Sequence, residues 1–226
     1  GEKRRACLRT VMCGRYYIDK RVESALPVDA GLGPADTLGW REFLKKSAGD
    51  VCPSQQVPVL TGEGGELHLE LMTWGFLPPS GEQKRDGKVR PGGLLINARA
   101  ETALEKRMFR DSIRSRRCVI PAGHFYEWDE DRNRAEFSDR ESPLLYMAGF
   151  YRYFQEEKRF IILTTKANAS VERVHDRMPV LLEKEEIESW VFEDEFVPFV
   201  LGRTPGELKV FREYQQTTLA DLGLEL

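Results

Sequence analysis

Short runs of β-branched and aromatic residues recur along this chain, and turn-forming residues separate them more often than helical segments do. Such runs favour strands, because these side chains pack well on a pleated surface. Strands joined by turns pair antiparallel, whereas parallel strands need longer, usually helical, crossovers. We therefore predict an α+β fold, a single domain with a curled, mostly antiparallel, barrel-like sheet and short flanking helices. The expected strands are residues 14–18, 67–74, 118–120, 144–154 and 160–165.

Helical patterns in this sequence are short. Thr102 and Glu105 have the spacing of a capping box, and Leu104 and Met108 follow at helical i,i+4 spacing. This combination predicts a helix across roughly residues 100–115. Further short helices are expected near residues 170–174, 184–191 and 205–214.

The chain has 226 residues, of which 41% are hydrophobic, and this is enough to bury the core of one ordinary domain. Proline and glycine gather in residues 78–93, which we interpret as a long surface loop within that domain. No apolar run is long enough to span a membrane, and no signal segment is present, so we expect a cytoplasmic protein, nucleoid-associated if bacterial, without membrane contact. The four cysteines form no Cys-x-x-Cys pair, so neither a metal nor a cofactor is predicted.

Charge is unevenly distributed along the chain. The net charge is −3 overall, and an acidic average argues against a nucleic-acid binder. Residues 183–226, however, hold 11 acidic and 4 basic residues, so residues 1–182 carry a net charge of +4. Basic residues concentrate in the stretch 99–117, where Arg110 and Arg114 lie. This stretch is either a solvated helix face or a surface that contacts phosphates, and the sequence leaves both alternatives open.

Four segments combine functional groups that a hydrophobic core does not need. They read MCGR at 12–15, NARAET at 97–102, RCVIPAGHFYEW at 117–128, and TTKAN at 164–168 followed by VHDRMP at 174–179. Each motif alone is weak evidence, but their joint occurrence in this order is specific. Together they resemble the SOS response-associated peptidase (SRAP) family, whose members crosslink themselves to abasic sites in single-stranded DNA. The resemblance covers nearly all of residues 12–182.

The resemblance implies a catalytic group built around Cys13, which becomes the first residue when Met12 is removed. Its α-amine would attack the aldehyde of a ring-opened abasic sugar, and its thiol would then close on the imine to give a thiazolidine. By the same resemblance, Asn97 holds the amine and the sugar-phosphate in register. Glu127 would transfer protons during imine formation, and His175 would protonate the sugar ring oxygen.

The DNA contacts of the family carry over in the same way. Arg15 and Arg99 are expected to bind the flanking phosphates. Trp74 resembles the family's tryptophan that abuts the bases beside the lesion, and the alternative is a core aromatic at a strand end. The resulting partner is single-stranded DNA that contains abasic sites, bound by a monomer. We expect the phosphate track to extend to Lys84, Arg85, Arg110 and Arg114.

Two features depart from the family pattern. His124 occupies a position where glycine is common, and we expect it to shape the pocket rather than to catalyse. Eleven residues precede Met12, and if they persist then Cys13 has no free amine. We interpret residues 1–12 as a leader, a mis-assigned start or an added extension. Residues 13–226 would then form one domain with the acidic part at its C-terminal end.

The sequence is compatible with three functions. The leading one is an enzyme of the DNA damage response that shields abasic sites through a covalent thiazolidine crosslink, with crosslinking or lyase-type activity. The second is a thiol autopeptidase with Cys13 as nucleophile and His175 as its base. The third is a non-covalent reader of modified or single-stranded DNA.

Overall fold

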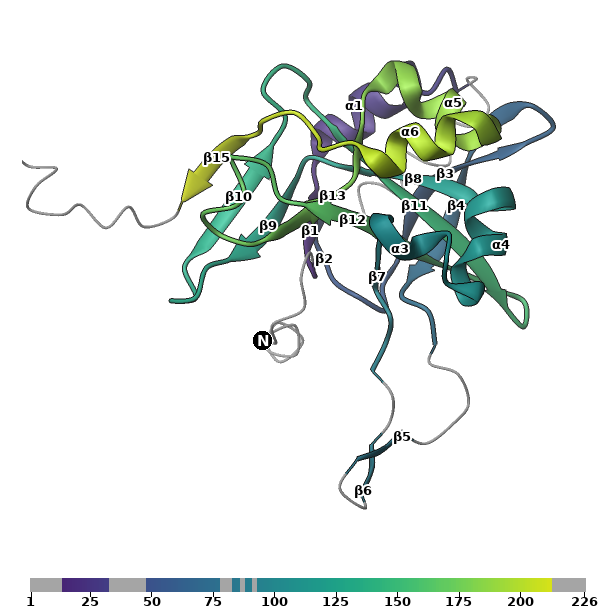
Figure 1. Cartoon of the computed structure of the whole chain (residues 1–226). Coiled ribbons are helices and arrows are strands. Elements are labelled where there is room, and N and C mark those ends of the chain that lie inside the picture. The colour runs from purple at the N-terminus through teal and green to yellow at the C-terminus, as the bar shows by residue number, and fades with distance from the viewer. Residues whose placement is uncertain (1–13, 33–47, 78–82, 86–87, 91–92, 213–226) are drawn as a thin grey trace, which may run out of the picture.

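Two antiparallel-rich sheets form the body of the protein (Figure 1). The computed structural model describes residues 14–32, 48–77, 83–85, 88–90 and 93–212. Within them, the first sheet is entirely antiparallel, and its strand order is β15 (Lys209–Arg212), β10 (Arg134–Ser138), β9 (His124–Trp128), β1 (Tyr16–Ile18) and β2 (Gly49–Val51).

The second sheet closes on itself. Its members are β13 (Arg177–Pro179), β12 (Glu157–Lys166), β4 (Glu66–Trp74), β3 (Gln56–Glu63), β8 (Arg117–Ala122), β11 (Leu145–Phe154), β14 (Leu181–Leu182) and β7 (Asn97–Arg99). Strand β12 pairs with both β4 and β11, so the path β12–β4–β3–β8–β11 returns to its start as a barrel. Only the pairings of β12 with β4 and β7 are parallel among the described strands. The predicted curled, mostly antiparallel sheet with a barrel-like core is confirmed.

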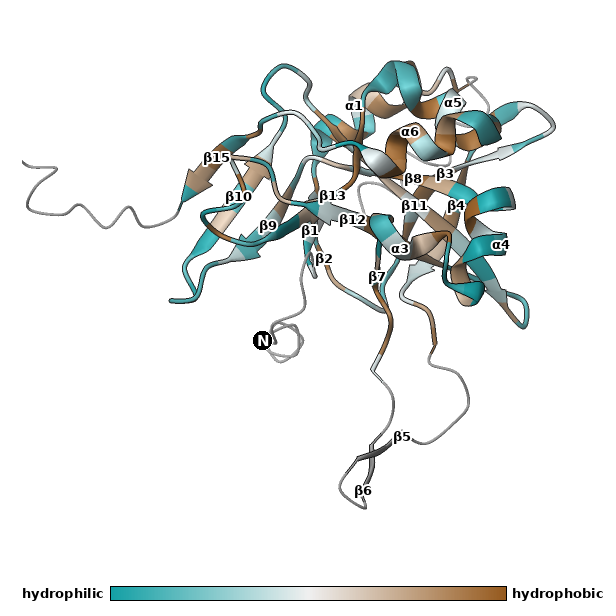
Figure 2. Ribbon diagram, in the orientation of Figure 1, coloured by the Kyte–Doolittle hydropathy of each residue, from teal (hydrophilic) through white to brown (hydrophobic). Residues whose placement is uncertain are grey.

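Short helices cover the barrel, and two of them lie between its strands β7 and β8 in the chain. The helices are α1 (Lys20–Asp29), α3 (Ala100–Ala103), α4 (Arg107–Ser115), α5 (Ile187–Phe192) and α6 (Val197–Gly202), with 3-10 turns η1 (Lys184–Glu186) and η2 (Asp194–Phe196). Helix α4 packs on β11 and α5 packs on β8. Because both faces of β8 are covered, all six of its residues are buried. Figure 2 shows α4 hydrophilic over most of its visible turns.

The five predicted strands are all present, as β1, β4, β8, β11 and β12. The helix near residues 184–191 is also confirmed, by η1 and α5. The helix predicted near residues 170–174 is wrong, since the structure has turns there, with the Asn168 side chain accepting hydrogen bonds from the amides of Ser170 and Val171. The helix predicted from residue 205 is wrong as far as the structure describes it, since β15 pairs there with β10.

The helix predicted over residues 100–115 is broken in the middle. Helix α3 ends at Ala103 and α4 begins at Arg107. Thr102 does not cap a helix, because it lies inside α3, and its carbonyl accepts the amide of Glu105. The Arg110 guanidinium donates to the carbonyls of Leu104 and Glu105, at 3.0 and 3.2 Å, and so satisfies backbone groups that the break exposes.

The stretch 78–93, predicted as a loop, contains the hairpin of β5 (Gln83–Arg85) and β6 (Lys88–Arg90). Figure 1 shows this hairpin projecting away from the barrel. None of the described helices is long and apolar enough to cross a membrane.

Candidate nucleic-acid interface

Strand β12 brings together two of the four sequence motifs at its C-terminal end, including both parts of the fourth. On one edge it pairs in parallel with β7, so that Thr164 lies opposite Arg99. On the other edge it pairs with β13, so that Lys166 lies opposite Arg177. Segments 97–102, 164–168 and 174–179 are therefore neighbours across a single strand.

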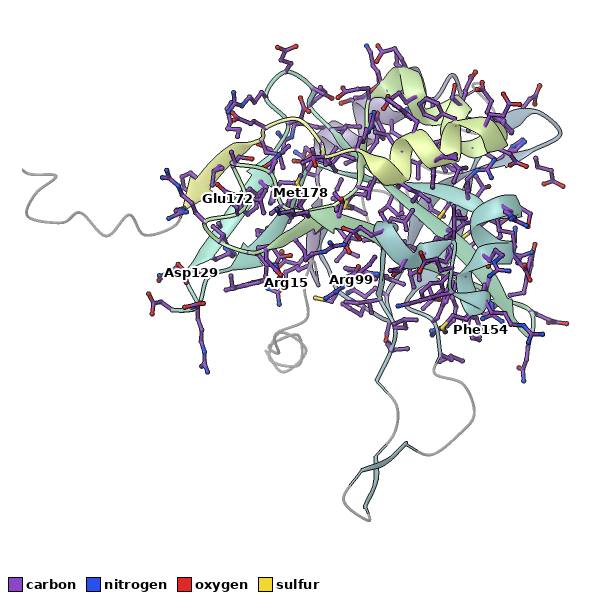
Figure 3. The ribbon with its side chains drawn as sticks, in the orientation of Figure 1. Arg15, Arg99, Asp129, Phe154, Glu172 and Met178 are labelled. Atoms are coloured by element: carbon purple, nitrogen blue, oxygen red, sulfur yellow. The ribbon has the colours of Figure 1, made fainter. Side chains whose placement is uncertain are left out.

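Strands β1 and β9 bring together the remaining two motifs. Tyr16 pairs with Phe125, and the Tyr126 amide donates to the carbonyl of Arg15 at 3.1 Å. The Arg15 guanidinium lies 5.3 Å from the centre of the Trp128 ring and 3.9 Å from the Asp50 carboxylate. Its side chain is thus held at the start of β1. Figure 3 shows Arg15 and Arg99 on the same side of the molecule.

Trp74 connects the two sheets, and the prediction that it stacks on DNA bases is wrong. Its side chain is completely buried, with ring centres 5.3 Å from Tyr16 and 6.2 Å from Phe160. Its indole N–H donates to the carbonyl of Ile96 at 3.1 Å. A base cannot reach a ring that the core encloses on all sides. Trp74 instead fixes the start of β1 relative to the residue that precedes Asn97.

Glu127 is a buried carboxylate, with 3% of its surface exposed. It lies on β9 opposite Ala135, and strand alternation places it on the same face as Phe125, which belongs to the core. A carboxylate withdrawn from water in this way is costly to the fold, and such a cost is often associated with function. Asn97 is half-buried at the start of β7, opposite Ile162, and Arg99 is exposed two residues later.

His175 lies in the turn before β13 and is half-buried. Its Nδ1 accepts the backbone N–H of Arg177 at 3.1 Å and lies 3.0 Å from a carboxylate oxygen of Asp176. The Arg177 guanidinium is buried and binds both carboxylate oxygens of Glu101, at 2.5 and 2.8 Å. These hydrogen bonds hold the pKa of Glu101 below its usual value.

The pair of Glu101 and Arg177 was not assigned a role from the sequence. Both residues stand inside the motifs, but only the fold shows that they meet, since 76 positions separate them. The sequence does place an arginine in the segment VHDRMP and a glutamate in the segment NARAET, and opposite charges in two motifs are the signal that could have suggested the pair.

The basic stretch 99–117 divides into two kinds of arginine. Arg117 is buried, and it binds the carbonyls of Trp190 and Val191, carbonyls of α4, and the carboxylate of Asp194. Arg117 therefore fits neither a solvated helix face nor a surface that contacts phosphates, because its guanidinium is used inside the fold. Arg110 is exposed, but its guanidinium is occupied by the break between α3 and α4, whereas Arg114 is exposed on α4.

Three of the predicted site residues cannot be located at the level of side chains. Cys13 lies outside the described residues, as do the side chains of Lys84 and Arg85 on β5. Within the described part of the chain, no three His, Cys, Asp or Glu side chains gather as a metal site would need.

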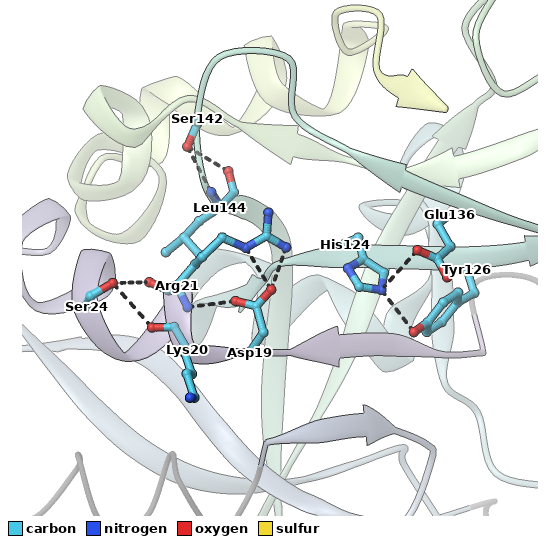
Figure 4. Close-up of polar contacts among 9 residues, drawn as sticks. All are labelled: Asp19, Lys20, Arg21, Ser24, His124, Tyr126, Glu136, Ser142 and Leu144. Atoms are coloured by element: carbon cyan, nitrogen blue, oxygen red, sulfur yellow. Dashed lines mark hydrogen bonds and ion pairs between the residues drawn. The ribbon is translucent and has the colours of Figure 1, made fainter. Parts of the chain in front are cut away.

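His124 belongs to a polar cluster on the other face of β9 (Figure 4). Its ring stacks on Tyr17 with centres 4.9 Å apart, and its Nε2 lies 2.9 Å from the Tyr126 hydroxyl and 3.8 Å from Glu136. Burial is the main cause that lowers the pKa of His124. Because it alternates with Glu127 along the strand, it does not face the same side as the buried carboxylate.

The fold defines a class of small α+β protein in which a closed barrel packs beside a second antiparallel sheet, with the motif segments on β12 of the barrel and on β1 and β9 of the second sheet. The family model described as SOS response associated peptidase (SRAP) matches residues 12–201, and the chain belongs to this family.

Two relatives agree with this assignment, and a solved structure shares the fold. The chain is 36% identical over 193 residues to the abasic site processing protein YoqW of Bacillus subtilis, covering 80% of each chain. It is 34% identical over 193 residues to the abasic site processing protein YoaM of the same species, covering 80% of this chain and 79% of YoaM. A crystal structure of a protein from Bacteroides thetaiotaomicron shares the fold, with a TM-score of 0.68 at 21% identity over 91% of this chain and 93% of that one.

Proposed function

We propose that this chain processes abasic sites in DNA by forming a covalent thiazolidine crosslink between Cys13 and the abasic sugar of single-stranded DNA. The observation that carries the proposal is the meeting of dispersed motif segments: Arg15 is held beside β9, Trp74 ties the start of β1 to the start of β7, and β12 joins β7 to the His175 turn. The names of the relatives YoqW and YoaM support the same substrate.

The proposed reaction needs an amine, a thiol and two proton-transfer groups, and no oxidant. The α-amine of Cys13 adds to the C1 aldehyde of the open sugar, and loss of one water gives the imine. The thiol sulfur then bonds to the imine carbon while the nitrogen takes up a proton, which closes the five-membered ring. His175 would protonate the ring oxygen so that the sugar opens, and Glu127 would carry protons to and from the amine.

The remaining site residues would bind the DNA. Asn97 would hold the amine and the sugar-phosphate together, and Arg15 and Arg99 would contact the flanking phosphates by charge-assisted hydrogen bonds. A net charge of +4 over residues 1–182 is modest for a duplex binder. It suits a protein that docks on a few phosphates and secures its substrate by a covalent bond.

The decisive experiment incubates protein that begins at Cys13 with a single-stranded oligonucleotide carrying one abasic site. We expect a protein–DNA band that survives denaturation, and Cys13→Ala should abolish it. The matched control retains residues 1–12, and it should form no such band because its Cys13 amine is part of a peptide bond. Absence of the band with intact DNA binding would favour a non-covalent reader of modified or single-stranded DNA instead.

The family description favours one second candidate, a thiol autopeptidase that cuts before Cys13. In that case purified protein retaining residues 1–12 would release them without an added aminopeptidase. His175→Gln and Cys13→Ala would both stop the release. Intact mass measured over time distinguishes this activity from crosslinking.

Glu127→Gln tests the proton-transfer role within the proposed reaction. We expect crosslinking to slow by roughly 10²-fold, the usual contribution of an acid–base group. Affinity for an intact single strand should stay unchanged, because Glu127 is buried and not a phosphate contact. The control is His124→Gln on the opposite face of β9, which should crosslink at the wild-type rate. A large loss of affinity in Glu127→Gln would assign this carboxylate to the structure.

A further inference from the structure

The turn that carries His175 lies next to an ion pair whose arginine is buried. Arg177 is 9% exposed, and a buried guanidinium requires a counter-charge and acceptors. It finds both carboxylate oxygens of Glu101 and the carbonyl of Thr164, the latter at 2.7 Å. One side chain therefore joins α3, β12 and β13, the elements that border the His175 turn.

The same residue also contacts the His175 ring through its backbone. The Arg177 N–H points at Nδ1, and this contact requires an unprotonated nitrogen with a free electron pair. The Asp176 carboxylate lies equally close to Nδ1, but it would require a proton there. These two contacts favour opposite states of one atom.

The structure indicates which contact prevails in the neutral ring. Arg177 is fixed in the ladder between β13 and β12, opposite Lys166. The Asp176 side chain is 83% exposed, so water can replace its contact at little cost. Nδ1 thus accepts from Arg177, and the proton of the neutral imidazole resides on Nε2.

We infer that Glu101 and Arg177 are positioning residues, which hold the β13 backbone so that its amide keeps His175 in the tautomer with the proton on Nε2. The catalytic consequence rests on the function proposed above, where His175 delivers a proton to the sugar. In the neutral ring this tautomer offers an Nε2–H that can donate a hydrogen bond to the sugar ring oxygen, and protonation at Nδ1 gives the imidazolium that then transfers the Nε2 proton to that oxygen. The other tautomer would direct its N–H at Asp176 and leave an unprotonated Nε2 facing the sugar. Neither residue needs to touch DNA for this role.

The tautomer itself can be measured without any DNA. The chain contains three histidines, so long-range proton–nitrogen NMR spectra are simple, and His175→Gln assigns the relevant ring. At alkaline pH we expect the proton on Nε2 in the wild type and a shift toward Nδ1 in Glu101→Gln. The matched control is Glu105→Gln, an exposed carboxylate in the same segment, which should resemble the wild type. A proton on Nδ1 in the wild type, or no change in Glu101→Gln, would overturn the inference.

Crosslinking kinetics test the consequence. In single-turnover experiments at saturating DNA, Glu101→Gln should slow crosslinking roughly tenfold, with affinity for an intact strand within about twofold of wild type. Arg177→Lys should be similarly slow, because a lysine cannot bind both carboxylate oxygens and the carbonyl together. In a His175→Gln background, Glu101→Gln should have no further effect, since both changes act through one group.

Two kinetic outcomes would contradict the inference. If Glu101→Gln slowed crosslinking equally with and without His175, Glu101 would act by another route. If Arg177→Lys lost much of its affinity for the intact strand, Arg177 would be a DNA contact. If the wild type formed no crosslink at all, the proposed function would fail, whereas the NMR result would still decide the tautomer.

Discussion

The two ends of the basic stretch 99–117 place the same side chain in opposite environments. At one end, Arg99 is exposed where α3 begins, across β12 from the strand β13 that follows His175. At the other end, Arg117 is buried under α5, and most of its donors bind backbone carbonyls. The comparison shows that a local excess of positive charge does not by itself define a binding surface. Burial decides which arginines remain available to phosphates.

Arg117→Met should produce the largest loss of stability. The change leaves four carbonyls without their buried donor, those of Ile113, Arg114, Trp190 and Val191. An unsatisfied buried acceptor costs about 1–3 kcal/mol, and we expect partial rearrangement of the 3-10 turn η2 at Asp194 to reduce the sum. We expect the free energy of unfolding to fall by about 3 kcal/mol in urea titrations, with DNA affinity of the folded protein unchanged.

Arg114→Met is the control for this measurement. Arg114 is exposed on α4, so its replacement should alter the free energy of unfolding by no more than about 0.5 kcal/mol. Equal destabilisation by both substitutions would remove the distinction between buried and exposed arginines in this stretch.

Arg99→Ala should affect DNA binding and leave stability unaltered. A phosphate contact contributes a counterion to the salt dependence of binding, so the slope of log affinity against log salt should flatten by about 1. Affinity should weaken for every sequence tested, because phosphates carry no base information. Filter binding of intact oligonucleotides at several salt concentrations measures both quantities. An unaltered slope would exclude Arg99 from the phosphate contacts.

The sequence predicts the sheets better than the helices of this chain. Strands such as β11 and β12 are long runs of residues with intrinsic strand preference, and neighbours in the barrel reinforce that preference. The break between α3 and α4 could not be foreseen, because it depends on hydrogen bonds that the Arg110 side chain donates to the carbonyls of Leu104 and Glu105, and a hydrophobic pattern does not report them. Strand β15 likewise depends on its pairing with β10, which is a tertiary contact.

The site shows the same division between local and tertiary information. The motifs nominate Asn97, Arg99, Glu127 and His175, but motif letters do not report burial. Trp74 was nominated as a DNA contact, and the enclosure by Tyr16 and Phe160 that excludes it exists only in the folded chain. The link between Glu101 and Arg177 spans distant segments, so it too becomes visible only when β12 aligns them.

The smallest expected effect on the free energy of unfolding depends on pH and concerns Glu101, which lies near Arg99 at the exposed end of the stretch 99–117. The pKa of Glu101 is lowered in the folded protein, chiefly by hydrogen bonds from Arg177, so the ionised carboxylate stabilises the fold. This contribution is complete above the unfolded pKa of about 4.3 and is lost as the pH falls through the lower folded value. The difference in free energy of unfolding between wild type and Glu101→Gln should therefore be constant from neutral pH down to about pH 5 and shrink in more acidic solution.

The size of this difference should be small. Because the Glu101 side chain is 44% exposed, water screens the pair, and the constant difference at neutral pH should be lower than the loss of stability in Arg117→Met. Urea titrations at a series of pH values measure the difference, and a gap that widened on acidification would show that Glu101 is not stabilised in its charged form.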